Sequence, residues 1–353
     1  MTGTMAAHIL KTVGLRILAA LLVLLGVLQV LDLLDVTTDI IERELGLAGV
    51  AYYALLRLPR LIEQAAPLAV LSGALFGFTK LARNSEVTAM RAAGMSAYRV
   101  TALAVPAAVL VMAVQLLMAT VVAPRTDQTL TDWWRATTPS ADQKAAEPRT
   151  FRLGADIVVA TPASVGGERL TDLTIYHRNA EGRLTQTTRA RSAIYRDGAW
   201  VLEAPTFRSV APGRVQSSSA AEMIWRSDLT PGDVEALFAG SQISPGAAAA
   251  GLEGKAAVRP RSYYATQLQR FAADPLACVV MLLLAAPVAL ANFRSGGTAL
   301  LVSCLAAGLV FLVVDGVFVA VGESGLAAAW LAAWAAPVLF SVGGLTALIY
   351  LEG

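Results

Sequence analysis

The sequence predicts an α-helical membrane protein with six transmembrane helices and one inserted all-β domain. Six long stretches are almost free of charged residues, and one polar block interrupts them between the third and the fourth. A stretch of about 20 apolar residues matches the ~30 Å hydrocarbon core of a bilayer at about 1.5 Å per residue. Hydrophobic residues make up 56% of the 353 residues and charged residues 15%, whereas about 25% charged is usual in soluble proteins.

Three of the predicted spans precede the polar block and three follow it. They lie at 17–31, 64–79, 100–124, 275–293, 295–322 and 324–351, and Asp315 is the only charged residue inside them. The basic start of the chain resembles a signal peptide, but no small-residue cleavage site follows, so an uncleaved first span is expected. The predicted domains are 1–124 for the first three helices, 125–260 for the insert with its linker, and 261–353 for the last three helices.

Lys and Arg in the short loops predict how the chain faces across the membrane. They gather at the N-terminus, between the second and third spans, and between the fourth and fifth: Lys11, Arg16, Lys80, Arg83, Arg91, Arg99 and Arg294. The connection between the first two spans begins with acidic residues, and the loop between the last two has Glu323 and no base. We therefore expect a multi-pass membrane protein with both termini cytoplasmic and the large domain on the opposite side, which in a bacterium is the periplasm.

Short β-prone runs predict that the polar block is built from strands. One pair of runs flanks the turn-forming segment 179–182, and another flanks Asp197 and Gly198, the residue pair that type I′ turns prefer. The runs are 151–153, 157–160, 174–178, 183–187, 192–196 and 200–203. Several short strands separated by turns are typical of a sandwich or a jelly roll.

The end of the polar block predicts a return to the membrane. Thr230 and Asp233, with Pro and Gly between them, indicate the start of a helix. The segment 244–254 is rich in Gly and Ala, so we expect a flexible connection there. Arg259, Pro260 and Arg261 mark the expected point of re-entry.

No constellation of catalytic residues is found in the sequence. A phosphate-binding loop needs Gly, four residues and then Gly-Lys-Ser/Thr, and the nearest segment, 251–256, has the wrong spacing and lacks the hydroxyl. His8 and His177 are far apart in the chain, while Cys278 and Cys304 lie inside apolar spans. The sequence therefore predicts a non-catalytic chain with no metal site, no disulfide, no bound cofactor and no nucleic-acid partner.

The loop between the second and third spans is the most specific local feature, and it predicts a short helix at about 84–95. Asn84 or Ser85 is suited to cap the start of this helix, and Glu86 lies in its first turn, where the helix dipole favours an anion. Gly94 is suited to a left-handed end, and Ser96 is suited to cap the third span.

Such a short helix needs packing to hold it, because about ten residues are marginally helical alone in water. Val87 and Met90 share the face that would pack. Two interpretations are open at this point. The segment is either a surface helix that lies at the lipid headgroups or a coupling helix that docks into a partner protein.

Two segments closely resemble the LptF/LptG permeases of the lipopolysaccharide exporter. The first runs from Leu58 through Pro59 and Arg60 to Pro67, and the second runs from 81 to 94 with Asn-Ser-Glu at its centre. The resemblance extends over the whole chain through the six spans, the insert after the third span, and Asp315 late in the fifth. The insert itself matches the family only in size and pattern.

The resemblance implies a permease subunit of an ATP-driven exporter. Such an exporter extracts lipopolysaccharide from the inner membrane and passes it to a periplasmic bridge towards the outer membrane. The implied partners are an LptF-like second permease, a dimer of an LptB-like ATPase that uses ATP and Mg, and LptC- and LptA-like jelly-roll proteins. In this family the short helix docks on the ATPase, so the implied contact residues are Ser85, Glu86, Met90, Arg91 and Gly94.

Within the family, two features resemble the LptG branch more than the LptF branch, which stays the alternative. Trp330 and Trp334 stand near the start of the last span, and Leu-Pro-Arg60 leads into the second span. One feature departs from the pattern. Members of the LptG branch often carry lysines near the periplasmic end of the first span, suited to lipid phosphates, and the corresponding region here contains none.

We expect a lipid path at the periplasmic half of the first, second and fifth spans. A charged side chain in hydrocarbon costs about 2.5–3.5 kcal/mol on insertion scales, so such residues usually face a cavity or an opposite charge. The simpler alternative is that these side chains only anchor helix ends at the headgroups. The candidate path residues are Gln29, Asp32, Asp35, Arg57, Arg60, Arg135 and Asp315.

Two other classes of function compete with the exporter. A membrane scaffold or sensor would use the β domain to bind a ligand, but it would need a cytoplasmic output domain, and only short loops are available for one. A membrane enzyme that acts on lipids would need clustered His or acidic residues at the interface, and none cluster in the sequence.

Overall fold

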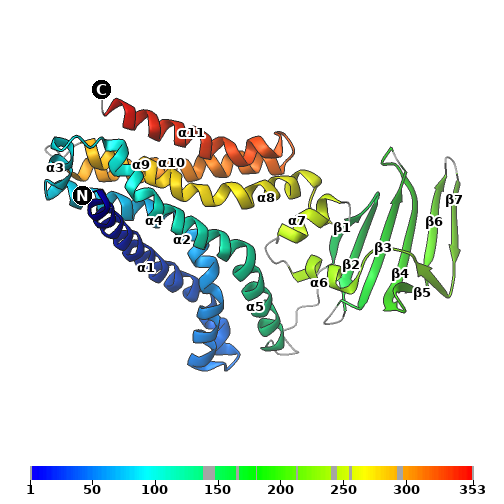
Figure 1. Ribbon diagram of the computed structural model, residues 1–353. Coiled ribbons are helices and arrows are strands. Elements are labelled where there is room, and N and C mark those ends of the chain that lie inside the picture. The colour runs from blue at the N-terminus through cyan, green and yellow to red at the C-terminus, as the bar shows by residue number, and fades with distance from the viewer. Residues whose placement is uncertain are drawn as a thin grey trace. The chain divides into compact units, whose positions relative to one another are not determined.

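The computed structural model describes residues 2–137, 148–163, 167–179, 181–211, 214–239, 245–253, 257–291 and 297–351. The chain divides into two compact units. One unit contains Met1–Leu130 and Thr266–Gly353, and the other contains Thr131–Ala265. The first is helical and the second is mainly β, as Figure 1 shows by residue colour.

The helical unit contains the predicted spans. Six helices in the described part of the chain are long and apolar enough to cross a membrane, which confirms the predicted class. The elements are α1 (Thr2–Glu42), α2 (Gly46–Arg83), α3 (Glu86–Ala92), α4 (Ala97–Leu117) with the π-helical η1 (Met118–Val122) and α5 (Ala123–Thr137), α8 (Arg261–Ala273) with the 3-10 turn η2 (Asp274–Leu276) and α9 (Ala277–Ala291), α10 (Gly297–Glu323), and α11 (Ala329–Tyr350).

Several helices run well past the apolar stretches that predicted them. The first span was expected to end at Leu31, yet α1 continues through three aspartates to Glu42. The third was expected to end at Pro124, but α5 carries it to Thr137. Polar residues are common near helix ends, where they reach headgroups or water, so the apolar stretch marks only the buried part of a longer helix.

Two elements form the centre of the helical unit. Helix α2 packs against α1, α4, α9 and α10, and α9 also packs against α4, α10 and α11. In the most apolar 18-residue stretch of each helix, 67% of the stretch is buried in α2 but only 11% in α1. The outer side of α1 is therefore left to face lipid or another protein.

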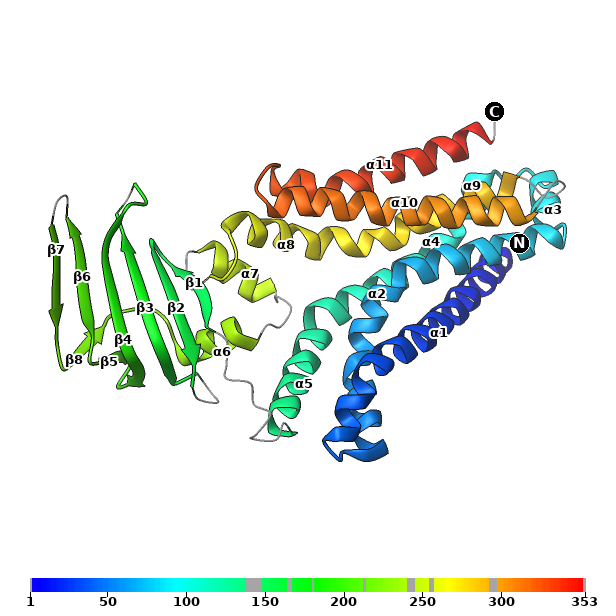
Figure 2. The same cartoon turned by 180° about the vertical axis from the view of Figure 1, so that it is seen from behind.

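Both termini lie at the end of the helical unit that carries α3, as Figures 1 and 2 show from opposite sides. This arrangement agrees with an even number of crossings. The loop between α9 and α10, residues 292–296 with the predicted basic Arg294, lies outside the described residues.

The inserted unit is an antiparallel sheet, which confirms the predicted all-β insert. Its strands are β1 (Arg149–Leu153), β2 (Asp156–Pro162), β3 (Arg169–Arg178), β4 (Leu184–Arg196), β5 (Ala199–Glu203), β6 (Thr206–Ala211), β7 (Arg214–Ser219) and β8 (Glu222–Trp225). The order is β1-β2-β3-β4-β5-β8, with β6 beside β4 and β7 beside β6. All eight described strands belong to one sheet that does not close.

Strand β4 holds this sheet together because its two halves have different neighbours. Its residues 192–196 pair with β5, and its residues 186–189 pair with β6. The sequence predicted two separate strands here, at 183–187 and 192–196. The predicted turn is present, since Asp197 and Gly198 both have positive φ angles, 51° and 81°.

Two helices accompany the sheet. Helix α6 (Pro231–Ala239) begins where the sequence predicted, because Asp233 accepts from the Thr230 backbone N–H at 3.0 Å and donates its own N–H to Thr230 Oγ1 at 3.2 Å. Helix α7 (Pro245–Leu252) occupies most of the segment that was expected to be a flexible connection. The core under these elements includes Phe151, Trp200 and Trp225.

Candidate functional site

Helix α3 forms a small surface element that is anchored on one face. Val87 and Met90 are buried in the main hydrophobic core of the helical unit, together with residues of α2 and α4. Ser85, Arg91 and Gly94 are exposed on the other side. This arrangement holds a short helix in place while it leaves one face open for contact with a partner.

The start of α3 is built differently from the expected cap. Ser85 stands at the N-cap position with φ of 60°, and its side chain makes no capping hydrogen bond. Asn84 instead donates to Glu86 Oε1 at 3.1 Å. The other end is as predicted: Gly94 has φ of 81°, and the Ser96 side chain caps α4 by accepting from the Arg99 N–H at 3.2 Å.

Glu86 is also held by the first helix. Its Oε2 lies 2.8 Å from Nε2 of His8 on α1, a contact that joins residues far apart in the sequence. Slight burial opposes the charged form of the carboxyl, but hydrogen bonds from Asn84 and His8 outweigh it and lower the pKa of Glu86. The carboxylate therefore stays ionised at neutral pH and is presented in a fixed orientation.

A cavity of about 180 Å³ lies in the helical unit. It forms where regular helical geometry is interrupted: beside Pro67 of α2, at the η2 turn between α8 and α9, and beside Pro337 of α11. Its walls combine charged, polar and apolar side chains. The lining residues that carry charge or an amide are Glu63, Gln64, Gln115, Arg270, Asp274 and Asp315.

Arg270 is the central cation of this cavity. Its Nε donates to Oδ1 of Asp274 at 3.0 Å, and its Nη2 lies 3.8 Å from Oδ2 of Asp315 on α10. The predicted path residue Asp315 thus has an opposite charge beside it, as expected for an acid within a span. The sequence did not single out Arg270 or Asp274, although their spacing of four residues on a helix was a usable signal.

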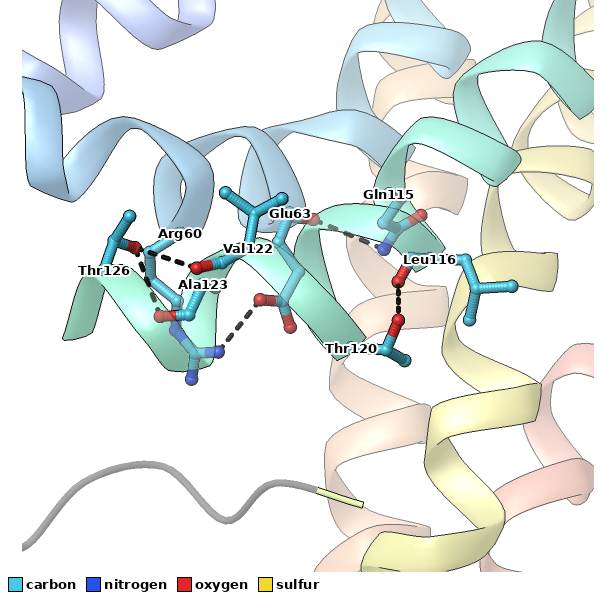
Figure 3. Close-up of polar contacts among 8 residues, drawn as sticks. All are labelled: Arg60, Glu63, Gln115, Leu116, Thr120, Val122, Ala123 and Thr126. Carbon is cyan, nitrogen blue, oxygen red and sulfur yellow. Dashed lines mark hydrogen bonds and ion pairs between the residues drawn. The ribbon is translucent and has the colours of Figure 1, made fainter. Parts of the chain in front are cut away.

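Glu63 and Gln115, which also line the cavity, make the polar contacts that Figure 3 shows. Arg60 Nη1 donates to Oε2 of Glu63 at 2.9 Å, so a predicted path residue has a partner that the sequence did not single out. Gln115 of α4 donates through Nε2 to the Glu63 backbone carbonyl at 3.3 Å, and the Cys278 thiol of α9 donates to Gln115 Oε1 at 3.1 Å. One buried amide therefore joins three helices.

The remaining predicted path residues fall into separate places. Asp32 and Arg57 form an ion pair between α1 and α2, with Nε–Oδ1 and Nε–Oδ2 distances of 3.0 and 3.2 Å. Asp35 is exposed, and the amide atoms of Gln29 are buried without a hydrogen-bond partner among the described residues. Arg135 belongs to α5, but its side chain lies outside the described residues.

The polar residues described above form ion pairs and hydrogen bonds between helices. Among the described residues, no group of three His, Cys, Asp or Glu side chains is placed to hold a metal ion. His177, in the inserted unit, is bonded to Asp156 at 2.8 Å and to Thr188 at 3.0 Å, which resembles a catalytic triad. The Thr188 side chain is buried, with 1% exposure, so its hydroxyl is not accessible to a substrate and the three residues instead tie together β2, β3 and β4.

Comparisons with known proteins agree on one family. The family model described as lipopolysaccharide export system permease LptF/LptG matches residues 7–350. The lipopolysaccharide export system permease protein LptG of Escherichia coli strain K12 is 22% identical over 326 residues, which cover 90% of this chain and 89% of the relative. The protein of the same name from Escherichia coli O6:H1 matches with the same identity and coverage.

Proposed function

Because this chain belongs to the LptF/LptG family of lipopolysaccharide export permeases, we propose that it is the LptG-type subunit of an ATP-driven exporter. It would extract lipopolysaccharide from the bacterial inner membrane and pass it to a periplasmic bridge. The chain would act with an LptF-like permease, an LptB-like ATPase dimer, and LptC- and LptA-like jelly-roll proteins. The ATPase would bind ATP and Mg, and this chain would bind neither.

The geometry of α3 is the observation that supports a role in coupling the permease to the ATPase. Its apolar face is buried in the helical core, whereas Glu86 is fixed by two hydrogen bonds beside an exposed surface. A helix anchored in this way can transmit a push from a bound protein into α1, α2 and α4. We therefore assign Ser85, Glu86, Met90, Arg91 and Gly94 to the ATPase contact, with Met90 as the anchor on the core side.

The same assignment gives an orientation. The end of the helical unit that carries α3 and both termini would be cytoplasmic, as the loop charges predict. The inserted unit would then be periplasmic. The LptF-type subunit is the alternative for this chain, because the two branches share the features that define the family.

Co-purification tests the proposal. The tagged full-length chain, expressed in its native host, should bring down a second six-span permease, an ATPase and lipopolysaccharide. ATP hydrolysis should appear only in fractions that contain the ATPase. Robust hydrolysis by the isolated chain, or purification without any ATPase or second permease, would contradict the exporter. Which of the two permease genes supplies the co-purified partner decides between the LptG and LptF types.

A further inference from the structure

The fourth span of the helical unit is interrupted near its middle. Helix α8 ends at Ala273, the η2 turn covers Asp274–Leu276, and α9 begins at Ala277. Pro275 has no N–H, so the carbonyl of Phe271, four residues earlier, receives no helical hydrogen bond from it. The continuous ladder that makes a helix stiff is therefore broken at this turn.

The half of the span that follows the break is fixed by apolar packing. Residues of α9 lie in the main hydrophobic core with α2, α4, α10 and α11. Cys278, Met281 and Leu282 are completely buried there. Close packing of this kind allows little movement, because any shift would open a cavity.

The half that precedes the break is held differently. Within the described residues, α8 contributes no side chain to that core cluster. It is tied to α10 by the Gln267 amide, which donates to Glu323 Oε1 at 2.7 Å, and by Arg270, which lies 3.8 Å from Asp315. It is tied to α11 by Trp334, which donates to Gln269 Oε1 at 3.3 Å. These are side-chain contacts between polar groups, which can exchange partners without opening a void.

One close contact of α8 leaves a buried hydroxyl without a hydrogen-bond partner among the described residues. A Cβ atom added at Gly322 of α10 would lie 3.0 Å from Oγ1 of Thr266, so the two helices nearly touch there. The Thr266 hydroxyl is buried at this contact without a hydrogen-bond partner among the described residues. An unpaired buried hydroxyl opposes the packed arrangement and so weakens this contact.

We propose that α8 is a hinged arm that turns about the Asp274–Leu276 break, and that Arg270 is its latch. The Arg270 guanidinium uses one nitrogen for Asp274, at the hinge, and another for Asp315, on α10. A guanidinium carries both donors in a fixed plane, whereas a lysine ammonium is a single point charge on a flexible stem. Release of Asp315 would remove the tie between α8 and α10 that lies nearest the hinge, loosen the arm and widen the cavity that Arg270, Asp274 and Asp315 line. The proposal does not depend on which lipid the protein moves.

Distances between spin labels test the arm directly. The full-length chain, with Cys278 and Cys304 changed to serine, is purified with its co-purifying subunits and placed in lipid nanodiscs. One label pair, Leu268→Cys with Val313→Cys, joins the exposed sides of α8 and α10. The control pair, Val313→Cys with Val338→Cys, joins exposed positions of α10 and α11, which pack together directly.

The latch variants are Arg270→Gln, Asp315→Asn and the conservative Arg270→Lys. We expect Arg270→Gln and Asp315→Asn to broaden the α8–α10 distance distribution or add a second distance, while the α10–α11 distribution stays unchanged. Arg270→Lys should give an intermediate result. An α8–α10 distribution that stays single and narrow in both neutral variants would overturn the hinged arm. Equal broadening of both label pairs would also overturn it, because that result indicates general loosening of the helices.

Discussion

At the scale of single residues, one buried amide of the helical unit is hydrogen-bonded across helices. Pro67 cannot donate to the carbonyl of Glu63, four residues earlier, so this acceptor has no partner within α2. Gln115 of α4 supplies the missing donor at 3.3 Å, and Cys278 of α9 bonds the other end of the same amide at 3.1 Å. The amide thus compensates for a proline on a different helix.

Gln115→Met should destabilise the helical unit by about 1–3 kcal/mol, because it leaves the Glu63 carbonyl and the Cys278 thiol without their partner. The measurement is thermal unfolding of the purified protein in detergent. Pro67→Ala restores an N–H within α2, so the loss caused by Gln115→Met should be smaller in a Pro67→Ala background. Gln64→Met is the matched control, since Gln64 is exposed on the same cavity wall. An equal loss in both backgrounds would show that the carbonyl is not the group that matters.

Glu86 allows a second test at this scale. If Glu86 meets a cation in a partly buried groove of the ATPase, Glu86→Ala should weaken the complex by roughly 2–5 kcal/mol, measured by titration of the ATPase onto the permease. If α3 only lies at the headgroups, the change should stay within about 0.5 kcal/mol. His8→Ala is the companion variant, since it removes one of the two groups that orient the carboxylate. Wild-type affinity in both variants would favour the headgroup interpretation.

The direction of the Glu86 pKa shift sets its pH dependence. A lowered pKa means that the contacts of the carboxylate stabilise the folded chain fully above the ordinary value of 4.5 and are lost as pH falls through the lower folded value. The charge of Glu86 should therefore not change between pH 6 and pH 8. Glu86→Gln, which mimics protonation, should weaken ATPase binding equally across that range.

At the scale of elements, glycines set how closely the first two helices approach. A Cβ atom at Gly73 of α2 would lie 2.3 Å from Cα of Ile17 on α1, which is far inside van der Waals contact with backbone. A Cβ at Gly77 would lie 3.1 Å from Cα of Val13. Small residues that allow backbones to approach are a common basis of helix association in membranes.

Gly73→Ala should separate α1 from α2 and cost about 1–3 kcal/mol or more, because the clash is with backbone rather than with a flexible side chain. Gly316→Ala on α10 is the control, since nothing lies within 4 Å of the added Cβ. Helix propensity alone should make that control neutral or stabilising by up to about 1 kcal/mol. The readout is the midpoint of thermal unfolding in detergent. Equal midpoints for the two variants would contradict the close contact.

At the scale of the whole molecule, the proposed lipid path predicts that labelling depends on depth along α1. A photo-crosslinker at Leu34, 68% exposed, should capture lipopolysaccharide if the path opens at the periplasmic half of the first span. Leu18, 51% exposed, is the matched control on the same helix, about 24 Å away at 1.5 Å per residue. Equal labelling at the two depths, or labelling at neither, would argue against this path.

The choice of positions follows from burial. Ala104, on the cytoplasmic side of the third predicted span, is completely buried. A crosslinker there could not reach lipid in either case, so the absence of labelling would not test the path. Asp32 is paired with Arg57, and the amide of Gln29 is buried, so labels at either position would disturb the contact between α1 and α2. Leu18 and Leu34 avoid both problems because their side chains are exposed.

Lipid phosphate recognition is the second prediction at this scale. The first span lacks the lysines expected near its periplasmic end, and Arg57 and Arg60 are each bonded to a carboxylate. We therefore expect binding of this chain to depend only weakly on lipid phosphate. Binding of phosphate-free lipopolysaccharide that is reduced by less than about tenfold, or 1.4 kcal/mol, would agree with this expectation. A collapse of binding would show that Arg57, Arg60 or the second permease supplies the cations.

The amino-acid sequence by itself determined the class of this protein, because long uncharged stretches have few alternatives to crossing a membrane. It also determined local features whose cause is local: the turn at Asp197 and Gly198, the helix start at Thr230, and the left-handed Gly94. Only the tertiary structure decided which polar groups meet. Arg270 with Asp315, Gln115 with Glu63, and His8 with Glu86 come from different helices, and helix packing sets those distances. The same reason explains why β4 forms one strand. Its neighbours β5 and β6 pair with different halves of it, and the local sequence pattern does not predict that pairing.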